Sequence, residues 1–229
     1  MTADWRPERL IAIGDIHGEF SKLDLLLNWV SPAQNDQFVF LGDYIDRGQN
    51  SCGVIERLME FEYEFPHAIF LRGNHEQMLL DSLAEIERDR QGEIPERTGL
   101  RLYNSDLEMF LANGGNETLR SYGLTSLDGI PKTHLEFIES TRLWWRHDNF
   151  LFVHAGVAPN TPLEQQDPVT LLMDRHSPPG ENGIIHVVGH TPTSGEPYFE
   201  HGRYNLDTGA VFGQSLTACD VLTREVWQI

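Results

Sequence analysis

A short apolar run that ends in glycine and then in a metal-ligating side chain recurs along this sequence. In the stretch 38–48, the apolar residues 38–41 are followed by Gly42 and at once by Asp43. Glycine allows the chain to turn sharply, and ligands of open α/β sheets bind beyond the carboxyl ends of the strands. Asp43 is therefore predicted at the edge of a sheet, facing a ligand.

Four other stretches end in a similar way. They lead to Asp15 and His17, to Asn74 and His75, to His154, and to His190. Carboxylate, amide and imidazole groups without thiolates suit divalent ions such as Mn²⁺, Fe²⁺ or Zn²⁺. Six or more such ligands are too many for one tetrahedral site but fit a pair of ions. The sequence therefore predicts a dinuclear metal site.

The order of elements predicts the fold class. Strands are predicted over 10–13, 38–41 and 68–71, and they alternate with helices over 19–30, 52–61 and 75–88. This alternation is typical of a largely parallel sheet. Further helices are predicted over 106–111, 117–122, 131–141 and 169–173.

The second half is richer in strands. After the strand that leads to His154, short strands are predicted over 185–188, 203–206, 215–222 and 225–228, and we expect them to form a second sheet packed on the first. The expected fold is α/β, with two mixed sheets flanked by helices in a single domain over 1–229. Residues 89–104 are predicted to be a mobile loop near the mouth of the site, or else a plain surface loop.

Composition excludes some partners. Lys and Arg number 17 against 35 Asp and Glu, which gives a formal net charge of −18. Such an acidic chain is a poor ligand for nucleic acid or for an anionic membrane. No signal peptide or membrane-spanning segment is expected, and only two cysteines are present, which suits a reducing, cytoplasmic compartment.

Five motifs occur in order: GDIHG (14–18), GDYIDRG (42–48), RGNHE (72–76), HAG (154–156) and GHTP (189–192). In these motifs the chain resembles the calcineurin-like metallophosphoesterases. More narrowly, it resembles the two-metal serine/threonine protein phosphatases in the compact form found in bacteria. The resemblance implies hydrolysis of phosphoserine or phosphothreonine in a phosphoprotein or phosphopeptide substrate.

The resemblance also implies a division of the metal ligands. Asp15, His17 and Asp43 would hold one ion, and Asp43, Asn74, His154 and His190 would hold the other. Asp43 would bridge the two ions, because a carboxylate has two oxygens and an imidazole cannot span two metals. The ions would be Mn²⁺, or else Fe or Zn²⁺. A hydroxide shared by the two ions would be the nucleophile.

The remaining roles follow from the same resemblance. His75 would be the general acid that protonates the departing alkoxide, and Asp46 would hold His75 as an imidazolium. Arg47, Arg72 and Arg175 would bind the phosphate, because guanidinium groups suit phosphate oxygens. The residues that precede Arg175 depart from the pattern of bacterial relatives.

Alternatives remain open. A symmetrical dinucleoside tetraphosphatase shares the metal motifs, although Asp46 and Glu76 favour the protein phosphatase. A non-catalytic scaffold is a more distant alternative, because no ligand is lost. Residues 113–115 either approach the substrate through their backbone or end a helix. The Asp-Thr-Gly sequence at 207–209 is interpreted as a turn.

Overall fold

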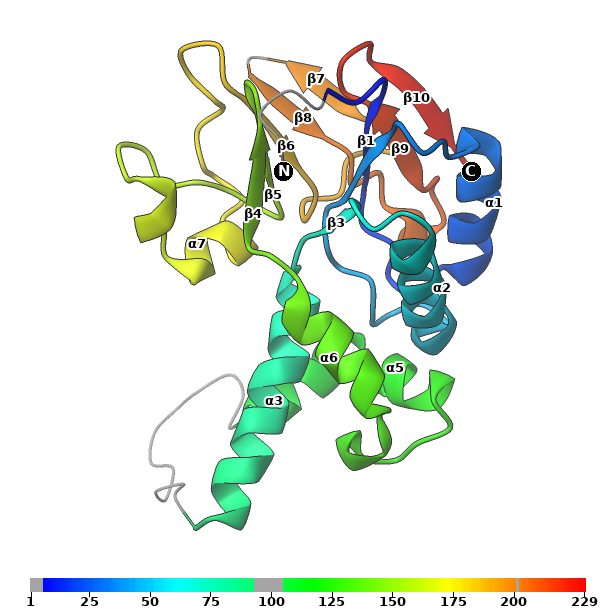
Figure 1. The fold of residues 1–229 in the computed structure, drawn as a ribbon. Helices are drawn as coiled ribbons and strands as arrows, with labels where there is room; N and C mark the ends of the chain where they lie inside the picture. Colours follow the sequence, from blue (N-terminus) through cyan, green and yellow to red (C-terminus); the bar gives the residue numbers. More distant parts are fainter. Residues whose placement is uncertain (1–5, 93–104, 201) are drawn as a thin grey trace.

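Two five-stranded β-sheets packed face to face form the centre of the computed structural model, which describes residues 6–92, 105–200 and 202–229 (Figure 1). The first sheet has the order β10-β9-β1-β2-β3, and its strands are β1 (Leu10–Ile13), β2 (Gln37–Phe40), β3 (Ile69–Phe70), β9 (Thr217–Asp220) and β10 (Glu225–Gln228). β1, β2 and β3 are parallel, whereas β9 and β10 are antiparallel to their neighbours. The parallel part confirms the predicted alternation of strands and helices.

The second sheet is also mixed. Its order is β4-β5-β6-β8-β7, with β4 (Trp144–His147), β5 (Phe150–Val153), β6 (Ile185–Val188), β7 (Tyr198–Glu200) and β8 (Arg203–Asn205). β5, β6 and β8 are parallel, and the outer strands β4 and β7 pair antiparallel with β5 and β8. Two mixed sheets flanked by helices confirm the predicted fold class.

One expectation about the tail is wrong. The predicted strands 215–222 and 225–228 do not join the second sheet, because β9 pairs with β1 and β10 pairs with β9. The register sets Cys219 opposite Ala12, so that both side chains face the second sheet. A carboxylate oxygen of Asp220 also accepts a hydrogen bond from the backbone N–H of Leu10 at 3.0 Å. The strands β4 and β7 were not predicted.

Helices cover the outer faces of the sandwich. α1 (Phe20–Val30) and α2 (Ser51–Glu64) flank the first sheet, and α7 (Pro168–Met173) flanks the second (Figure 1). α3 (Asn74–Arg90), α4 (Asp106–Phe110), η1 (Leu111–Gly115), α5 (Asn116–Ser121) and α6 (Lys132–Ser140) form a helical layer beyond β3. Three short helices, η2 (Leu127–Gly129), η3 (Leu163–Gln165) and η4 (Ala210–Phe212), lie in connecting segments.

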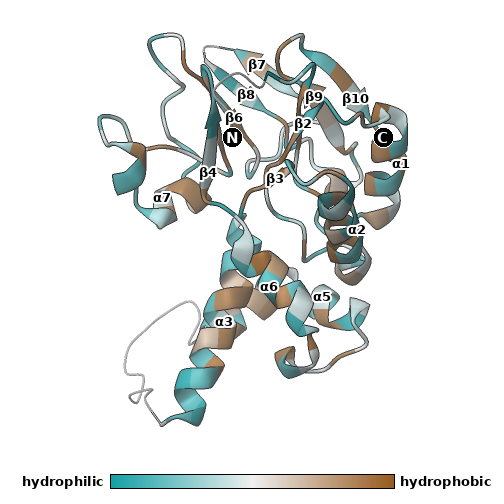
Figure 2. Ribbon diagram, viewed as in Figure 1, coloured by the Kyte–Doolittle hydropathy of each residue, from teal (hydrophilic) through white to brown (hydrophobic). Residues whose placement is uncertain are grey.

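Alternating side chains divide the core into three clusters, one between the two sheets and one on the outer side of each sheet. In β1, Leu10 and Ala12 face the second sheet, whereas Ile11 and Ile13 face the helices. In β5, Phe152 faces the first sheet and Val153 packs beside α7. Because successive side chains of a strand point to opposite faces, a strand buried on both faces is apolar at every position. Figure 2 shows the hydrophobic colouring of the neighbouring strands β2 and β3 and the hydrophilic outer end of α3.

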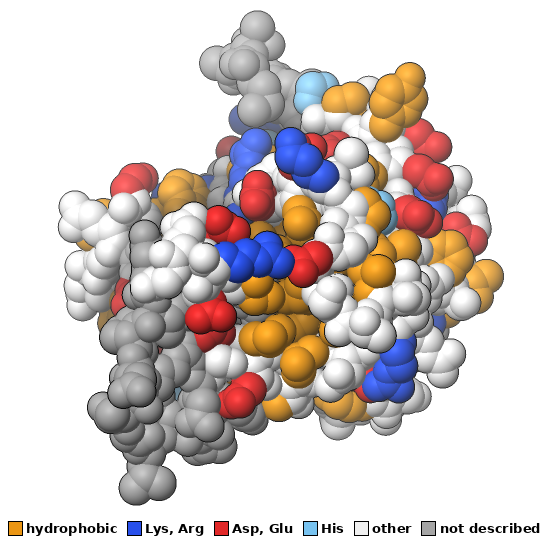
Figure 3. Space-filling view, turned by 90° about the horizontal axis from the view of Figure 1, so that it is seen from below, with side chains coloured by type: hydrophobic (Ala, Val, Ile, Leu, Met, Phe, Trp, Pro, Cys, Tyr) orange, Lys and Arg blue, Asp and Glu red, His pale blue; other side chains and the backbone are white. Residues whose placement is uncertain are grey.

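The surface of the helical layer is more varied. Seen from below, it shows hydrophobic side chains gathered in a shallow hollow, with acidic and basic side chains around it (Figure 3).

Two further predictions concern the loop 89–104 and membrane-spanning segments. Residues 89 and 90 belong to the last turn of α3, and residues 93–104 of the predicted loop lie outside the described residues. Among the described helices, none is both long and apolar enough to cross a bilayer.

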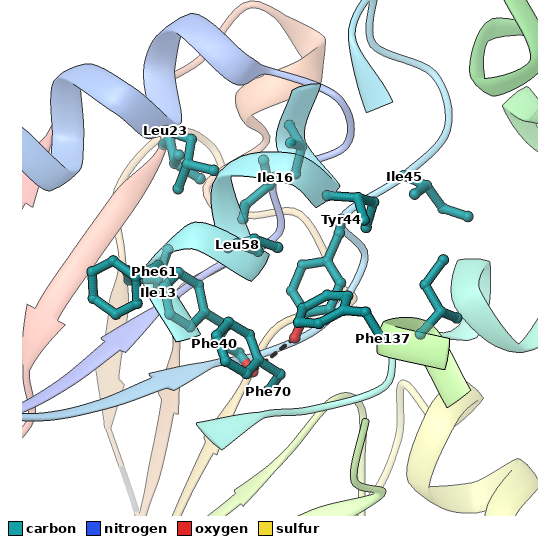
Figure 4. Packing of buried hydrophobic residues seen from close by; sticks show 14 of the residues in the cluster. Ile13, Ile16, Leu23, Phe40, Tyr44, Ile45, Leu58, Phe61, Phe70 and Phe137 are labelled. Carbon is teal, nitrogen blue, oxygen red and sulfur yellow. Dashed lines mark hydrogen bonds between the residues drawn. The ribbon is translucent and has the colours of Figure 1, made fainter. Parts of the chain in front are cut away.

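Aromatic rings fill the space between the first sheet and α2 (Figure 4). Phe61 is fully buried, and its ring centroid lies 4.9 Å from that of Phe38, 5.3 Å from that of Phe40 and 4.6 Å from that of Phe65. Tyr44 donates a hydrogen bond to the carbonyl of Leu71 at 2.6 Å, which anchors the turn after β2 to the strand β3. The core thus reaches directly to the segment that carries Asp43.

We expect Phe61→Ala to lower the free energy of unfolding by ~3–5 kcal/mol, because it leaves a cavity among three aromatic rings. Tyr63→Ala on the same helix is the matched control, since its side chain is 88% exposed. Denaturant unfolding of both variants measures the difference. A loss for Phe61→Ala no larger than that for Tyr63→Ala would contradict the described packing.

Candidate active site

Five strands deliver the predicted ligands to one edge of the sandwich. Asp15 and His17 follow β1, and Asp43 follows β2. Asn74 follows β3, while His154 and His190 follow β5 and β6, in that order; all six side chains are buried. The backbone is left-handed at three of them, with φ of 46° at His17, 53° at Asp43 and 65° at His190. Such conformations are uncommon outside glycine and cluster at functional sites.

The two carboxylate oxygens of Asp43 face two different groups of donors. Oδ1 lies 3.3 Å from Nε2 of His154, and Oδ2 lies 3.4 Å from Nε2 of His17. Oδ2 also lies 3.9 Å from Nε2 of His75. Asp43 is therefore the one carboxylate that belongs to both of the metal-competent groups among the described residues, His17 with Asp43 and His75, and Asp43 with His154 and His190.

Backbone carbonyls orient the imidazole rings. Nδ1 of His17 lies 2.8 Å from the carbonyl of Ile45, and Nδ1 of His154 lies 2.8 Å from that of Leu41. A carbonyl only accepts, so each Nδ1 carries a proton, and Nε2 is the nitrogen that has the lone pair when the ring is neutral. Carbonyl partners of this kind orient histidines that ligate metals.

Asn74 lies between the other two histidines. Its Oδ1 is 3.1 Å from Nε2 of His154 and 2.9 Å from Nδ1 of His190. Together with Oδ1 of Asp43, these atoms form a converging set of oxygen and nitrogen acceptors. Burial lowers the pKa of His154, but the Asp43 carboxylate, the Leu41 carbonyl and Glu76 together outweigh it and raise the pKa above its ordinary value. This corner of the site therefore favours positive charge.

Buried carboxylates that lie close together also favour positive charge in this site. Asp15 accepts a hydrogen bond from the backbone N–H of His190 at 3.0 Å. Burial, with Asp207 and Asp43 nearby, raises the pKa of Asp15 well above its usual range. Asp15 belongs to neither three-residue group, whereas His75 joins His17 and Asp43 in one of them. Carboxylate, amide and imidazole donors that converge in this way fit divalent cations.

His75 and Asp46 form a buried pair beside these donors. Nδ1 of His75 lies 2.7 Å from Oδ2 of Asp46. Nε2 of His75 is buried and has no hydrogen-bond partner among the described residues. Burial lowers the pKa of His75 to about 3 and raises the pKa of Asp46 to about 8. Burial therefore disfavours the charged forms of both groups, and Nε2 of His75 faces no hydrogen-bond partner among the described residues.

Two hydroxyl groups that sequence reasoning missed hold Asp46 in place. Thr118 of α5 donates to Oδ1 of Asp46 at 2.6 Å. The backbone N–H of Asp46 donates to Thr118 at 2.9 Å and to Ser51 at 3.1 Å. Thr118 is 72 positions from Asp46 in the chain, so no local spacing could have identified it.

Glu76 supports the turn that carries Asp43. Its buried carboxylate accepts hydrogen bonds from the backbone N–H groups of Asp43 and Gly73, each at 2.9 Å, and of Tyr44 at 2.8 Å. A fourth, longer bond of 3.3 Å comes from Ile45. The sequence suggested Glu76 only as a marker of substrate class, and the structure gives it a positioning role.

Arg47 lies beside the metal-competent groups. One of its guanidinium nitrogens is 2.7 Å from Nε2 of His17, and the guanidinium carbon lies 5.6 Å from the ring centroid of Phe212. The backbone N–H of Arg47 donates to the carbonyl of Gly114 at 3.3 Å. Phe212 is 59% exposed and lies at the rim of the site. The sequence did not predict this contact, because Phe212 and Arg47 are far apart in the chain.

The other two arginines differ in position. Nε of Arg175 lies 3.4 Å from Nε2 of His190, so Arg175 borders the site. The guanidinium of Arg72 is instead bonded to the Thr141 hydroxyl at 3.1 Å, to Gln77 at 3.0 Å and to the Glu139 carbonyl at 2.8 Å. These bonds join the segment before α3 to the end of α6, and the phosphate-binding role predicted for Arg72 stays a prediction.

Asp207 was interpreted only as a turn residue. Its Oδ1 accepts a hydrogen bond from the backbone N–H of Gly209 at 3.0 Å, which confirms the turn. Asp207 is also buried and interacts electrostatically with Asp15, Asp43 and His17. Burial raises its pKa above the ordinary value. The turn therefore places a further carboxylate next to the site.

Comparison with known proteins identifies the family. The calcineurin-like phosphoesterase family matches residues 8–213, and the chain belongs to this family. It is 32% identical over 231 residues to serine/threonine-protein phosphatase 1 of Salmonella typhimurium, covering 93% of this chain and 91% of the relative. It is 33% identical over 146 residues to human serine/threonine-protein phosphatase 5, covering 59% of this chain but 28% of that protein. The chain is thus homologous to serine/threonine protein phosphatases.

Solved structures share the fold at lower identity. A crystal structure described as a "putative diadenosine tetraphosphatase" superposes with a TM-score of 0.67 at 21% identity, covering 98% of this chain and 95% of that one. A cold-active protein-tyrosine phosphatase of a psychrophilic Shewanella gives a TM-score of 0.61 at 15% identity, covering 97% and 80%. These likenesses support the fold and do not distinguish between substrates.

We expect Asp43→Asn to lower bound metal from about two ions per chain and to abolish turnover, because it removes the carboxylate common to both groups. Metal analysis after dialysis against Mn²⁺ measures this. Asp220→Asn is the control, since Asp220 is a buried aspartate away from the site. Two bound ions and near-normal activity in Asp43→Asn would remove Asp43 from its bridging role.

Proposed function

We propose that this protein is a metal-dependent phosphomonoester hydrolase that acts on phosphoserine or phosphothreonine of proteins. The observation that carries the proposal is the position of the Asp46–His75 pair beside Asp43, whose two oxygens face separate groups of donors. Homology to serine/threonine protein phosphatases over most of the chain supports the same substrate class. Retention of all ligands and of His75 disfavours a scaffold without activity.

Asp15, His17 and Asp43 would hold one divalent ion, and Asp43, Asn74, His154 and His190 would hold the other. Bound divalent ions lower the pKa of water and neutralise charge on phosphoryl oxygens. Mn²⁺ is the proposed metal, with Fe and Zn²⁺ as alternatives, because oxygen and imidazole donors without thiolates suit all three. His75 lies in one metal-competent group with His17 and Asp43, so experiment must distinguish a metal ligand from a general acid at this position.

The proposed acid is His75. Asp46 fixes its ring through Nδ1, so that Nε2, which has no partner among the described side chains, can give a proton to the departing oxygen of the substrate. Burial disfavours the imidazolium, whereas an approaching phosphate dianion favours it, because opposite charges stabilise each other. Arg47 contacts His17 and Arg175 contacts His190. Together with Arg72, they are proposed to bind phosphoryl oxygens.

Other properties stay proposals. The cysteines Cys52 and Cys219 are both free, which supports a reducing, cytoplasmic compartment. The substrate is proposed to be a phosphoprotein or phosphopeptide rather than a nucleic acid, in line with the acidic composition. We also keep the single-domain interpretation of residues 1–229.

The ranking of substrates tests the proposed class. We expect kcat/KM with Mn²⁺ on a phosphothreonine or phosphoserine peptide to exceed that on diadenosine tetraphosphate by at least roughly tenfold, or ~1.4 kcal/mol of transition-state binding. Parallel initial-rate measurements on both substrates decide the matter. The opposite ranking would favour the symmetrical dinucleoside tetraphosphatase.

A substitution tests the proposed acid. We expect His75→Asn to keep both metal ions while kcat on an alkyl phosphoester falls by ~10²–10⁴. The loss on p-nitrophenyl phosphate should be much smaller, because its phenolate leaves without a full proton. Asp46→Asn should show the same pattern more weakly, and His147→Asn on β4 serves as the control.

Metal content separates the two possible roles of His75. Equal losses on both substrates, together with an emptied metal site, would show that His75 is a ligand. Such a result would contradict the assignment of His75 as the acid without affecting the assignment of Asp43.

A further inference from the structure

A polar cleft opens beside Arg47. Its volume is about 560 Å³, within the usual range for ligand sites. Its lining includes Arg47, Asn113, Gly114, Asn116, Glu117 and Arg120. These residues come from the turn after β2, from η1 and from α5, and all but Arg47 lack a role in the chemistry described above. The cleft therefore needs an explanation of its own.

The backbone joins this cleft to the active site. Gly114 has a φ of 109°, which interrupts the helix between α4 and α5. A Cβ atom at Gly114 would lie 2.5 Å from the backbone nitrogen of Arg47, so no other residue fits there without a shift. Glycine thus lets η1 lie directly on Arg47. Departures from regular α-helix of this kind are frequent at functional sites.

Distance limits what the cleft can receive. Arg47 contacts both His17 of the metal-competent group and the cleft, so the two places are separated by about one arginine side chain. An extended peptide advances by ~3.3–3.6 Å per residue. A peptide whose phosphorylated residue lies at the metal-competent groups would therefore place a residue one to three positions away in the cleft.

The lining indicates which side chain fits. Arg47, Arg120 and Glu117 are the charged residues of the lining, which leaves one excess positive charge in a chain whose formal net charge is −18. Because Glu117 pairs with Arg120, that excess lies at Arg47. The Arg120 side chain is 70% exposed and pairs with Glu117 of its own helix. Asn113 and Asn116 each use a side-chain N–H on a backbone carbonyl of the preceding turn, at 2.8 Å and 3.1 Å. Their amide oxygens and Arg120 suit a polar peptide with an acidic side chain.

We infer that this cleft is a specificity subsite for the segment that flanks the phosphorylated residue, and that Arg120 selects an acidic side chain one to three positions from it. The inference rests on the proposed phosphoprotein phosphatase function and adds the substrate sequence that the enzyme prefers. Arg47 would bind the phosphate at one end of the cleft, and Arg120 would meet the acidic side chain at the other.

Charge reversal tests the subsite. Two phosphothreonine peptides are compared, one with Asp and one with Lys at the positions flanking the phosphothreonine. The ratio of kcat/KM on the acidic peptide to that on the basic peptide should fall by about five- to tenfold in Arg120→Glu, because an attraction becomes a repulsion. Arg120→Ala should lower the ratio less, and Glu117→Gln should raise it. The opposite signs exclude a general loss of folding.

Arg88→Glu is the matched control. Like Arg120, Arg88 is an exposed helical arginine whose Nε donates to the carbonyl four residues before it. Within the described part of the chain, each of the two pairs with one carboxylate. It lies near the far end of α3, and its reversal should change the ratio by less than about twofold, as expected for a remote surface charge. A similar change of the kcat/KM ratio in Arg88→Glu would show that the effect comes from the overall charge of the protein. That result would contradict the proposed subsite.

The outcomes separate this inference from the proposed function. If the wild-type protein hydrolyses phosphopeptides but Arg120→Glu leaves the ratio unchanged, the subsite is wrong and the function stands. If no phosphopeptide is hydrolysed, both are wrong. If Arg120→Glu changes turnover of diadenosine tetraphosphate and not the peptide ratio, the cleft receives a nucleotide and the inference is overturned.

Discussion

The carboxylate of Glu76 fixes the geometry on which the candidate site depends. It accepts backbone hydrogen bonds from Asp43, Tyr44, Ile45 and Gly73, and therefore joins the turn after β2 to the start of α3. These two segments carry Asp43, Asn74 and His75. A charged acceptor that receives several backbone N–H groups stabilises its partners more than a neutral one does. This contact sets the spacing between Asp43, the proposed bridging carboxylate, and His75, the proposed acid.

Backbone strain explains why such support is needed. Asp46 and Arg47 have φ of 72° and 66°, so that two consecutive residues of the turn are left-handed in addition to Asp43. Conformations of this kind cost about 1–3 kcal/mol each and persist where the surroundings determine them. Thr118 and Ser51 supply part of that determination through the N–H of Asp46. The left-handed backbone and these hydrogen bonds together direct the side chain of Asp46 toward His75 and that of Arg47 toward His17.

The sequence predicted the parts of the site that repeat a local pattern. A buried strand, a glycine and a ligand such as Asp43 or Asn74 form a signal within a few residues, and the structure brings these side chains together. Thr118 reaches the site through tertiary packing, and the third position of its helix carries no local sign of that contact. The bonds of Arg72 to Thr141 and to the carbonyl of Glu139 in α6 are likewise tertiary contacts that its motif position does not reveal, and its phosphate-binding role stays a prediction. The same limit explains β9, whose partner β1 lies at the other end of the chain.

Four buried carboxylates at this edge of the sandwich favour the binding of a cation. Asp15, Asp43, Glu76 and Asp207 are all buried within one region, and burial raises the pKa of Asp15 and of Asp207. Each carboxylate raises the cost of ionising its neighbours, whereas a divalent ion would favour the ionised form of all of them. Binding of metal would then stabilise the folded chain, because the unfolded chain does not hold these groups together. The residues proposed to carry out the reaction are therefore also those through which a bound cation would stabilise the fold.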